Sequence, residues 1–294
     1  MLKPISSHLF WIEAPYQAKY LYSHSMFIAG SDVNVLVDTC CGEDNLQQLK
    51  KNGIDIVLNS HFHEDHTLNN PLFEEAVVWA HTDDAPAMRS LDVFADYYGF
   101  NEPETIRLGE QFIKGINLQP SKVDRELLAD EILDFGGVKL HVIHTPGHTP
   151  GHCCFYEEKN GVLFLGDIDL SGFGPWYAHQ CSDIDDFIVS IKKCLLIDPA
   201  IALSSHKGLF TGDIKPFLQK YLDKIFAVQD LILESLKVPR TLDELTDQQM
   251  FYGKSISLDP LYRAMEKMAI NLHLERLIRS GQIEQSDNLY YLSK

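Results

Sequence analysis

The chain has 294 residues, of which 45% are hydrophobic and 23% are charged. These values are typical of a globular protein, and the length allows one large domain with a small appendage. The formal net charge of −17 predicts a surface that repels nucleic acid and anionic membranes. The sequence has neither the run of roughly 18 apolar residues that a membrane span requires nor an N-terminal signal pattern. We therefore expect a cytoplasmic protein whose cysteines are reduced.

Short apolar runs alternate with amphipathic stretches along the first 238 residues, which predicts an α/β fold. The sequence predicts strands at 34–38, 54–58, 77–80, 138–144, 162–165 and 200–203. It predicts helices at 43–51, 182–196 and 216–237. We expect residues 83–130 to be helical or irregular, with aromatic side chains between 94 and 100 in a position to cover a site.

The last part of the sequence has a different pattern, and we place a domain boundary near Pro239 because Val238-Pro239 ends the preceding helix. A capping-box pattern from Thr241 to Glu244 predicts one helix, and Asp259-Pro260 predicts the start of a second. Residues 283–292 resemble a hairpin. The order helix, helix, hairpin predicts a winged-helix-like domain over 239–294, after a catalytic domain over 1–238.

Histidines and carboxylates are concentrated in the segment His61–His66, directly after the predicted strand 54–58. His61 and His63 are two residues apart, so both imidazoles can point to one side, while Asp65 and His66 can serve a second centre. A solvated polar loop is the alternative interpretation of this segment. Three further residues whose side chains can bind a metal each follow a predicted strand, namely His148, Asp167 and His206. A twisted sheet can bring the ends of these strands to one edge.

These residues resemble the signature of the metallo-β-lactamase-fold superfamily, H-x-H-x-D-H followed by spaced His, Asp and His, over about Phe10 to Thr211. The resemblance implies an αββα sandwich with two divalent metal ions. It assigns His61, His63 and His148 to one metal, assigns Asp65, His66 and His206 to the other, and makes Asp167 the bridge. Zinc suits these ligands, and iron (Fe) and manganese (Mn) accept the same groups.

The repeat Thr145-Pro-Gly-His-Thr-Pro-Gly-His152 is similar to a stretch of the glyoxalase II-like branch, in which the first histidine is the ligand. We therefore choose His148 over His152. The resemblance also implies that Asp38 supports the metal loop by hydrogen bonding. His141, His144 and His152 are expected to be structural, and His81 has a weaker claim to orient a ligand.

Two metal ions about 3.5–4 Å apart share a water and acidify it, so that a metal-bound hydroxide can attack a substrate carbonyl. Asp65 is the predicted catalytic residue, because it can hold or receive a proton. Glu64, between the ligands, is expected to point to solvent. These expectations predict a hydrolase that acts on a small ester, thioester or lactone.

The loop after Asp167 departs from the patterns of true glyoxalase II and of persulfide dioxygenases, so the substrate stays open. We assign Phe173, Trp176, Tyr177 and His179 in this loop to substrate contacts, with ordinary loop packing as the equal alternative. The family usually follows its motif with two glycines, whereas this chain continues His66-Thr-Leu-Asn-Asn70, so the loop must turn without them. Asparagine tolerates the left-handed backbone that such a turn can require.

Three other functions compete with the hydrolase prediction. A metal-dependent phosphodiesterase or ribonuclease would use the winged helix, but the net charge argues against a nucleic-acid partner. An iron-dependent oxidoreductase would use the same ligands, although no flavodoxin-like extension is present. A non-catalytic binding module would leave the complete ligand set unexplained. We expect a small-molecule partner and no membrane, and a homo-oligomer stays open.

Overall fold

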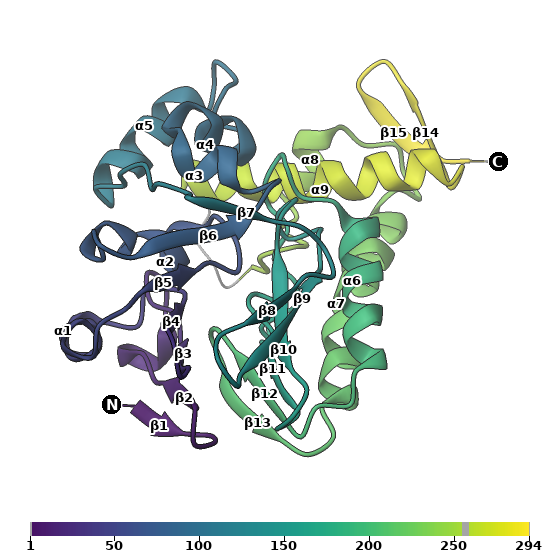
Figure 1. The fold of residues 1–294 in the computed structure, drawn as a ribbon. Helices are drawn as coiled ribbons and strands as arrows, with labels where there is room; N and C mark the ends of the chain where they lie inside the picture. Colours follow the sequence, from purple (N-terminus) through teal and green to yellow (C-terminus); the bar gives the residue numbers. More distant parts are fainter. Residues whose placement is uncertain (1, 255–258, 294) are drawn as a thin grey trace.

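The structure is a computed structural model, which describes residues 2–254 and 259–293. Two β-sheets face each other at the centre of the molecule (Figure 1). The first sheet is formed in order by β1 (Leu2–Pro4), β2 (Leu9–Ile12), β3 (Ser25–Ala29), β4 (Asn34–Val37), β5 (Ile56–Leu58), β6 (Val77–His81) and β7 (Arg125–Leu127). The second has the order β13 (Gly208–Thr211), β12 (Ile201–Ser204), β11 (Val162–Phe164), β10 (Cys153–Glu157), β9 (Lys139–His144) and β8 (Ile132–Asp134).

The central strands are continuous apolar runs because both of their faces are buried. In β5, Ile56 and Leu58 belong to the core between the two sheets, whereas Val57 belongs to the core between the first sheet and its helices. The strands β4 to β7 are parallel, as are β11 and β12. Parallel strands bring the ends of successive strands to the same edge of a sheet, which is where the predicted ligands lie.

Helices cover the outer faces of both sheets (Figure 1). On the side of the first sheet lie α1 (Glu43–Asn52), α3 (Ala85–Arg89), α4 (Leu91–Tyr98) and α5 (Ile106–Gly115). On the side of the second sheet lie α6 (Ile184–Leu196) and α7 (Lys215–Ser235). Two short 3₁₀ turns, Pro15–Ala18 and Asn70–Leu72, lie in loops. The layers confirm the predicted αββα sandwich, and residues 83–130 form three helices and β7.

The C-terminal part contains α8 (Leu242–Thr246), α9 (Pro260–Arg279), and the hairpin of β14 (Ile283–Ser286) and β15 (Leu289–Leu292). The predicted capping box at Thr241 is present, and the Asp259 side chain caps α9. The order helix, helix, hairpin is therefore as expected. A separate winged-helix domain stays a prediction.

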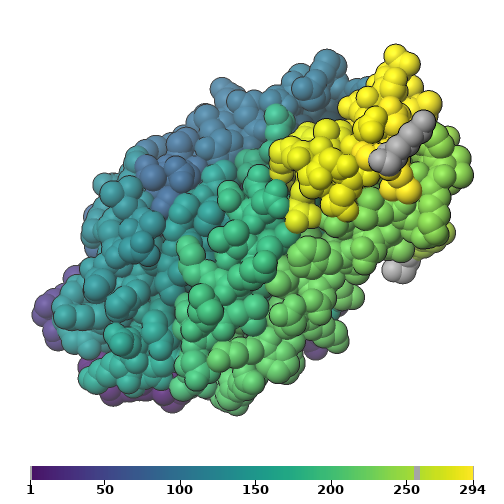
Figure 2. All heavy atoms as spheres, turned by 90° about the vertical axis from the view of Figure 1, so that its right-hand side faces the viewer, coloured from purple at the N-terminus to yellow at the C-terminus, as the bar shows by residue number. Residues whose placement is uncertain are grey.

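Hydrophobic contacts join the two sides of the predicted domain boundary between residues 238 and 239. Ile232 and Leu236 of α7 share a hydrophobic core with Leu274 of α9, whereas Met265 and Ala269 of α9 pack into the main core. Figure 2 shows the C-terminal residues, in yellow, seated directly against the rest of the molecule. The C-terminal part therefore packs against α7 and against the main core.

All six cysteines are free, and all but Cys181 are buried. Within residues 2–254 and 259–293, no helix combines the length and the apolar character needed to cross a membrane.

Candidate metal centre

The predicted ligands lie in loops and in one short helix at one edge of the two sheets. β5 ends at Leu58, and the His61–His66 segment follows within a few residues. His63 has an extended backbone (φ −61°, ψ 150°) and stands directly before the short helix α2 (Glu64–Thr67), so the helix begins in the middle of the segment. Strands β9, β11 and β12 of the second sheet end shortly before His148, Asp167 and His206.

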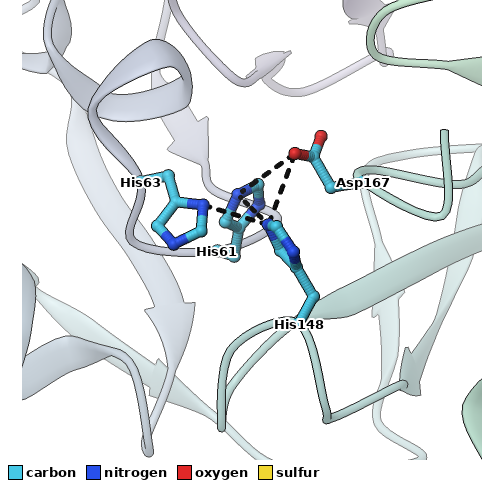
Figure 3. A group of neighbouring side chains, drawn as sticks. All are labelled: His61, His63, His148 and Asp167. Carbon is cyan, nitrogen blue, oxygen red and sulfur yellow. Dashed lines mark hydrogen bonds and ion pairs between the residues drawn. The ribbon is translucent and has the colours of Figure 1, made fainter. Parts of the chain in front are cut away.

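One cluster combines His61, His63, His148 and Asp167, whose ligand atoms lie within 4.8 Å of one another (Figure 3). Nε2 of His148 is 3.0 Å from Nδ1 of His63 and 3.3 Å from Nε2 of His61. Oδ2 of Asp167 is 3.3 Å from Nε2 of His148. All three imidazoles are buried. Three ring nitrogens and one carboxylate oxygen are a ligand set that zinc accepts.

A second cluster combines Asp65, His66 and His206. Nε2 of His206 is 3.5 Å from Oδ2 of Asp65, and Nε2 of His66 is 3.8 Å from Oδ1 of Asp65. Oδ1 of Asp167 is 3.1 Å from Nε2 of His66 and 3.4 Å from Nε2 of His206. The two oxygens of Asp167 therefore face different clusters, so one carboxylate is placed to bridge two metals.

The atoms at which the two clusters meet are suited to bind metal ions. Among the described residues, His66 Nε2 and Asp167 Oδ1 are buried and have no hydrogen-bond partner, which is costly unless something binds them. Burial lowers the pKa of His61 and of His63 well below the usual range, so both imidazoles are neutral and offer a lone pair. At His206 burial also lowers the pKa, but Asp167 outweighs it and raises the pKa to about 9. A metal ion must displace that proton.

The ring nitrogens that face away from the clusters have partners too. Four such contacts are His63 Nε2 to His179 Nδ1 (3.1 Å), His66 Nδ1 to Asp38 Oδ2 (2.8 Å), His148 Nδ1 to the Trp176 carbonyl (2.7 Å) and His206 Nδ1 to the Ala18 carbonyl (2.9 Å). Contacts of this kind fix the tautomer and the orientation of a metal-binding imidazole. The centre is therefore held in place before any metal binds.

Asp38 lies where the family resemblance implies. Its buried carboxylate accepts hydrogen bonds from the backbone N–H of Ser60 (2.8 Å) and from the Ser60 hydroxyl (2.7 Å), in addition to its contact with His66. The Ser60 hydroxyl oxygen is also 3.0 Å from Nδ1 of His61. Asp38 thus connects both clusters to the end of β4.

The remaining histidines near the centre belong to neither cluster. Nε2 of His152 accepts a hydrogen bond from the backbone N–H of Asp167. His144 stacks on His81 with ring centroids 4.0 Å apart, and these two form a third His/Asp group with Asp83. His81 therefore pairs with His144 instead of orienting a metal ligand.

Glu64 does not point to solvent, so that expectation is wrong. Its side chain is buried, and it accepts hydrogen bonds from the hydroxyls of Tyr20 (2.7 Å) and Tyr98. Burial, together with the neighbouring Asp65, raises the pKa of Glu64 to about 7. Glu64 thus joins the N-terminal loop and α4 to the metal-binding segment.

Asp84 was not identified from the sequence. Its buried carboxylate accepts hydrogen bonds from the backbone N–H of Phe62 (3.0 Å), from the Thr149 hydroxyl (2.7 Å) and from the backbone N–H of Gly151 (2.6 Å). A side chain at Gly151 would collide with Asp84, because an added Cβ would lie 2.7 Å from its atoms. Asp84 therefore joins the loop of His61 and His63 to the loop of His148.

A cavity of about 470 Å³ opens onto both clusters. Of the four predicted substrate contacts, Phe173 and Trp176 line this cavity. Tyr177 and His179 are fully buried outside its lining, so the structure does not place them where they would touch a substrate. Tyr177 instead contacts His273 of α9, and His179 contacts His63.

The protein consists of two packed sheets between layers of helices, and one aspartate lies between two His/Asp clusters at one edge of the sheets. This combination of fold and site is suited to a dinuclear metal centre. The family model of the Metallo-beta-lactamase superfamily matches residues 19–225. The chain belongs to this superfamily.

Similar proteins include hydrolases. The acyl-coenzyme A thioesterase MBLAC2 of Gallus gallus is 24% identical over 230 residues, which cover 72% of this chain and 82% of that protein. The hydroxyacylglutathione hydrolase GloC of Haemophilus influenzae is 36% identical over 83 residues, 28% of this chain and 39% of that protein. Among solved structures, a metallo-beta-lactamase family protein from Thermus thermophilus matches with a TM-score of 0.74 and 23% identity, over 98% of this chain and 100% of that chain.

Proposed function

We propose that this chain is a metal-dependent hydrolase that cleaves small thioesters. The observation that carries the proposal is the position of Asp167, whose two carboxylate oxygens face two separate His/Asp clusters at the floor of the cavity. The ligands would be His61, His63 and His148 for one metal, Asp65, His66 and His206 for the other, and Asp167 for both. Two divalent metal ions, which we propose to be zinc, supply an acidified water and polarise a carbonyl.

The residues around the clusters support the binding of a thioester. Asp65 lines the cavity, where its carboxylate can hold or receive a proton close to the reacting carbonyl. Lys19 and Lys207 also line the cavity and are exposed, so they can attract an anionic thiol carrier in a chain that is otherwise strongly acidic. The names of the two relatives above also describe thioester hydrolysis, which favours this class over simple esters and lactones.

The C-terminal part, residues 239–294, is proposed to be winged-helix-like and to pack on the catalytic part. The shared hydrophobic cores and the cavity residues that α9 supplies support a packing role. Of the positively charged residues on α9, Arg276 and Arg279 contact Asp185 of α6, so their charge is already paired within the chain.

The test is a panel of thioesters, lactones and phosphodiesters incubated with the purified protein, with and without a chelator. We expect release of free thiol from thioesters that stops when the metal is removed and returns when zinc is added. Turnover of phosphodiesters without turnover of thioesters would overturn the proposal and favour the nuclease alternative.

A further inference from the structure

The lining of the cavity at the two His/Asp clusters includes both polar and apolar residues. Its floor is formed by metal-ligand residues, which are polar. Another part of the lining, which we call the apolar wall, consists of Phe173 and Trp176 from the loop after β11 and of Tyr252, Leu261, Tyr262 and Met265 from the C-terminal part. The family match ends at residue 225, so most of the apolar wall lies outside it.

The C-terminal residues of the apolar wall are fixed by buried polar contacts. The carboxylate of Glu266 is fully buried in α9 and accepts hydrogen bonds from the backbone N–H groups of Phe251 (3.0 Å) and Tyr252 (2.9 Å). The Tyr252 ring packs edge-on against Tyr262, with ring centroids 5.2 Å apart. These contacts hold Phe251 and Tyr252 against α9, so this part of the apolar wall is preformed.

The apolar wall is also attached to the metal centre. The indole N–H of Trp176 donates a hydrogen bond to the Tyr252 hydroxyl, 3.0 Å away. The backbone carbonyl of the same Trp176 lies 2.7 Å from Nδ1 of His148. One residue therefore contacts both a predicted metal ligand and the C-terminal part, which fixes the distance between the apolar wall and the reacting atoms.

Part of the apolar wall is exposed, since Phe173 and Tyr262 each keep 40% of their surface accessible. Large apolar groups that remain exposed beside a reactive centre gain free energy when an apolar ligand covers them. We propose that the apolar wall binds the acyl group of the substrate, so that the enzyme prefers thioesters of apolar acyl groups to those of short or hydroxylated ones. This inference rests on the proposed thioester hydrolysis and specifies which class of thioester is the substrate.

The first test compares kcat/KM for the hexanoyl and acetyl thioesters of N-acetylcysteamine. We expect the wild-type protein to favour the hexanoyl thioester by at least about tenfold, and we expect Tyr262→Ala and Met265→Ala to reduce this ratio by about tenfold. Because Tyr262 is partly exposed, we expect Tyr262→Ala to fold. This variant therefore still provides the test if Met265→Ala does not fold. Tyr291→Ala, on the hairpin outside the cavity, is the matched control and should keep the wild-type ratio. Equal losses for both thioesters in Tyr262→Ala would overturn the proposal.

The second test measures binding without hydrolysis. Calorimetry compares the S-hexyl and S-methyl thioethers of N-acetylcysteamine, and we expect the S-hexyl compound to bind at least about tenfold more tightly to wild type but not to Tyr262→Ala. Equal binding of the two compounds, or no binding of either, would contradict the role of the apolar wall. Preferential S-hexyl binding without turnover of any thioester would refute the proposed function and leave the apolar wall assignment standing.

Discussion

The backbone N–H of Asp167 donates a hydrogen bond to Nε2 of His152, 3.0 Å away. Nδ1 of His152 lies 2.8 Å from the Thr145 hydroxyl oxygen, so both ring nitrogens have partners. Burial lowers the pKa of His152 to about 3, and the ring is therefore neutral. This explains why His148, and not His152, faces a metal cluster although each follows the same Thr-Pro-Gly sequence.

The first prediction compares these two histidines. We expect His148→Ala to lose a metal ligand and to retain about one metal ion per chain. We expect His152→Gln to keep two, with an affinity lowered by about 10- to 100-fold because it only positions Asp167. Elemental analysis and competition with a chelating dye measure both quantities. Loss of a metal ion from His152→Gln but not from His148→Ala would reverse the assignment.

A second prediction concerns Asp84. Replacing it with alanine leaves three buried donors without an acceptor, so we expect Asp84→Ala to lower the free energy of unfolding by about 3 kcal/mol. The exposed neighbour Asp83 is the control, and Asp83→Ala should change stability by less than about 0.5 kcal/mol. Urea denaturation measures both variants. Similar stabilities for the two would show that Asp84 does not hold the loops together.

The third prediction is that the group of His81, Asp83 and His144 binds no metal ion. The two imidazoles are stacked with an angle of 13° between their planes, so their lone pairs run side by side and do not converge on one point. In addition, Nε2 of His144 lies 2.8 Å from the Pro150 carbonyl. We therefore expect His81→Ala to retain the metal content of the wild type. A loss of one equivalent would show that this group is a third site.

A fourth prediction concerns pH. Burial, with a further contribution from Arg276, lowers the pKa of His273 from 6.5 to about 3. Below about pH 6.5 the unfolded chain takes up a proton that the folded chain does not, so this histidine reduces stability as the pH falls through that range. Between about pH 8 and about pH 5, wild type should lose about 2 kcal/mol more unfolding free energy than His273→Gln.

The control for this prediction is the exposed His8, and His8→Gln should follow the wild-type pH dependence. Urea denaturation at the two pH values gives the unfolding free energies. Parallel curves for wild type and His273→Gln would show that the buried ring does not cause the loss of stability.

Much of the metal centre could be predicted from the sequence because its signals are local. The His61–His66 segment carries candidate ligands of both clusters, and each remaining candidate ligand follows a short apolar strand. Asp84 had the same kind of signal, since it follows β6 within three residues. The αββα fold could be predicted only through the family resemblance, and the N-terminal strands β1 to β3 were not identified.

The burial of other residues could not be predicted because it depends on distant parts of the chain. Glu64 is buried by tyrosines that lie 44 and 34 positions away, and nothing in its own segment indicates them. Tyr177 is next to Trp176 in the sequence, but its hydroxyl contacts His273, 96 positions away, so only Trp176 lines the cavity. Periodicity describes which face of an element is apolar and leaves open which other element covers it.

The central claim is that two metal ions bound around Asp167 drive thioester hydrolysis. The most direct test adds zinc stepwise to metal-free protein and records the rate of thiol release from hexanoyl N-acetylcysteamine. We expect the rate to rise with added zinc and to stop rising at about two equivalents per chain, and we expect Asp167→Asn to stay inactive throughout. Thiol release that is independent of added metal, or that is unchanged in Asp167→Asn, would contradict this claim.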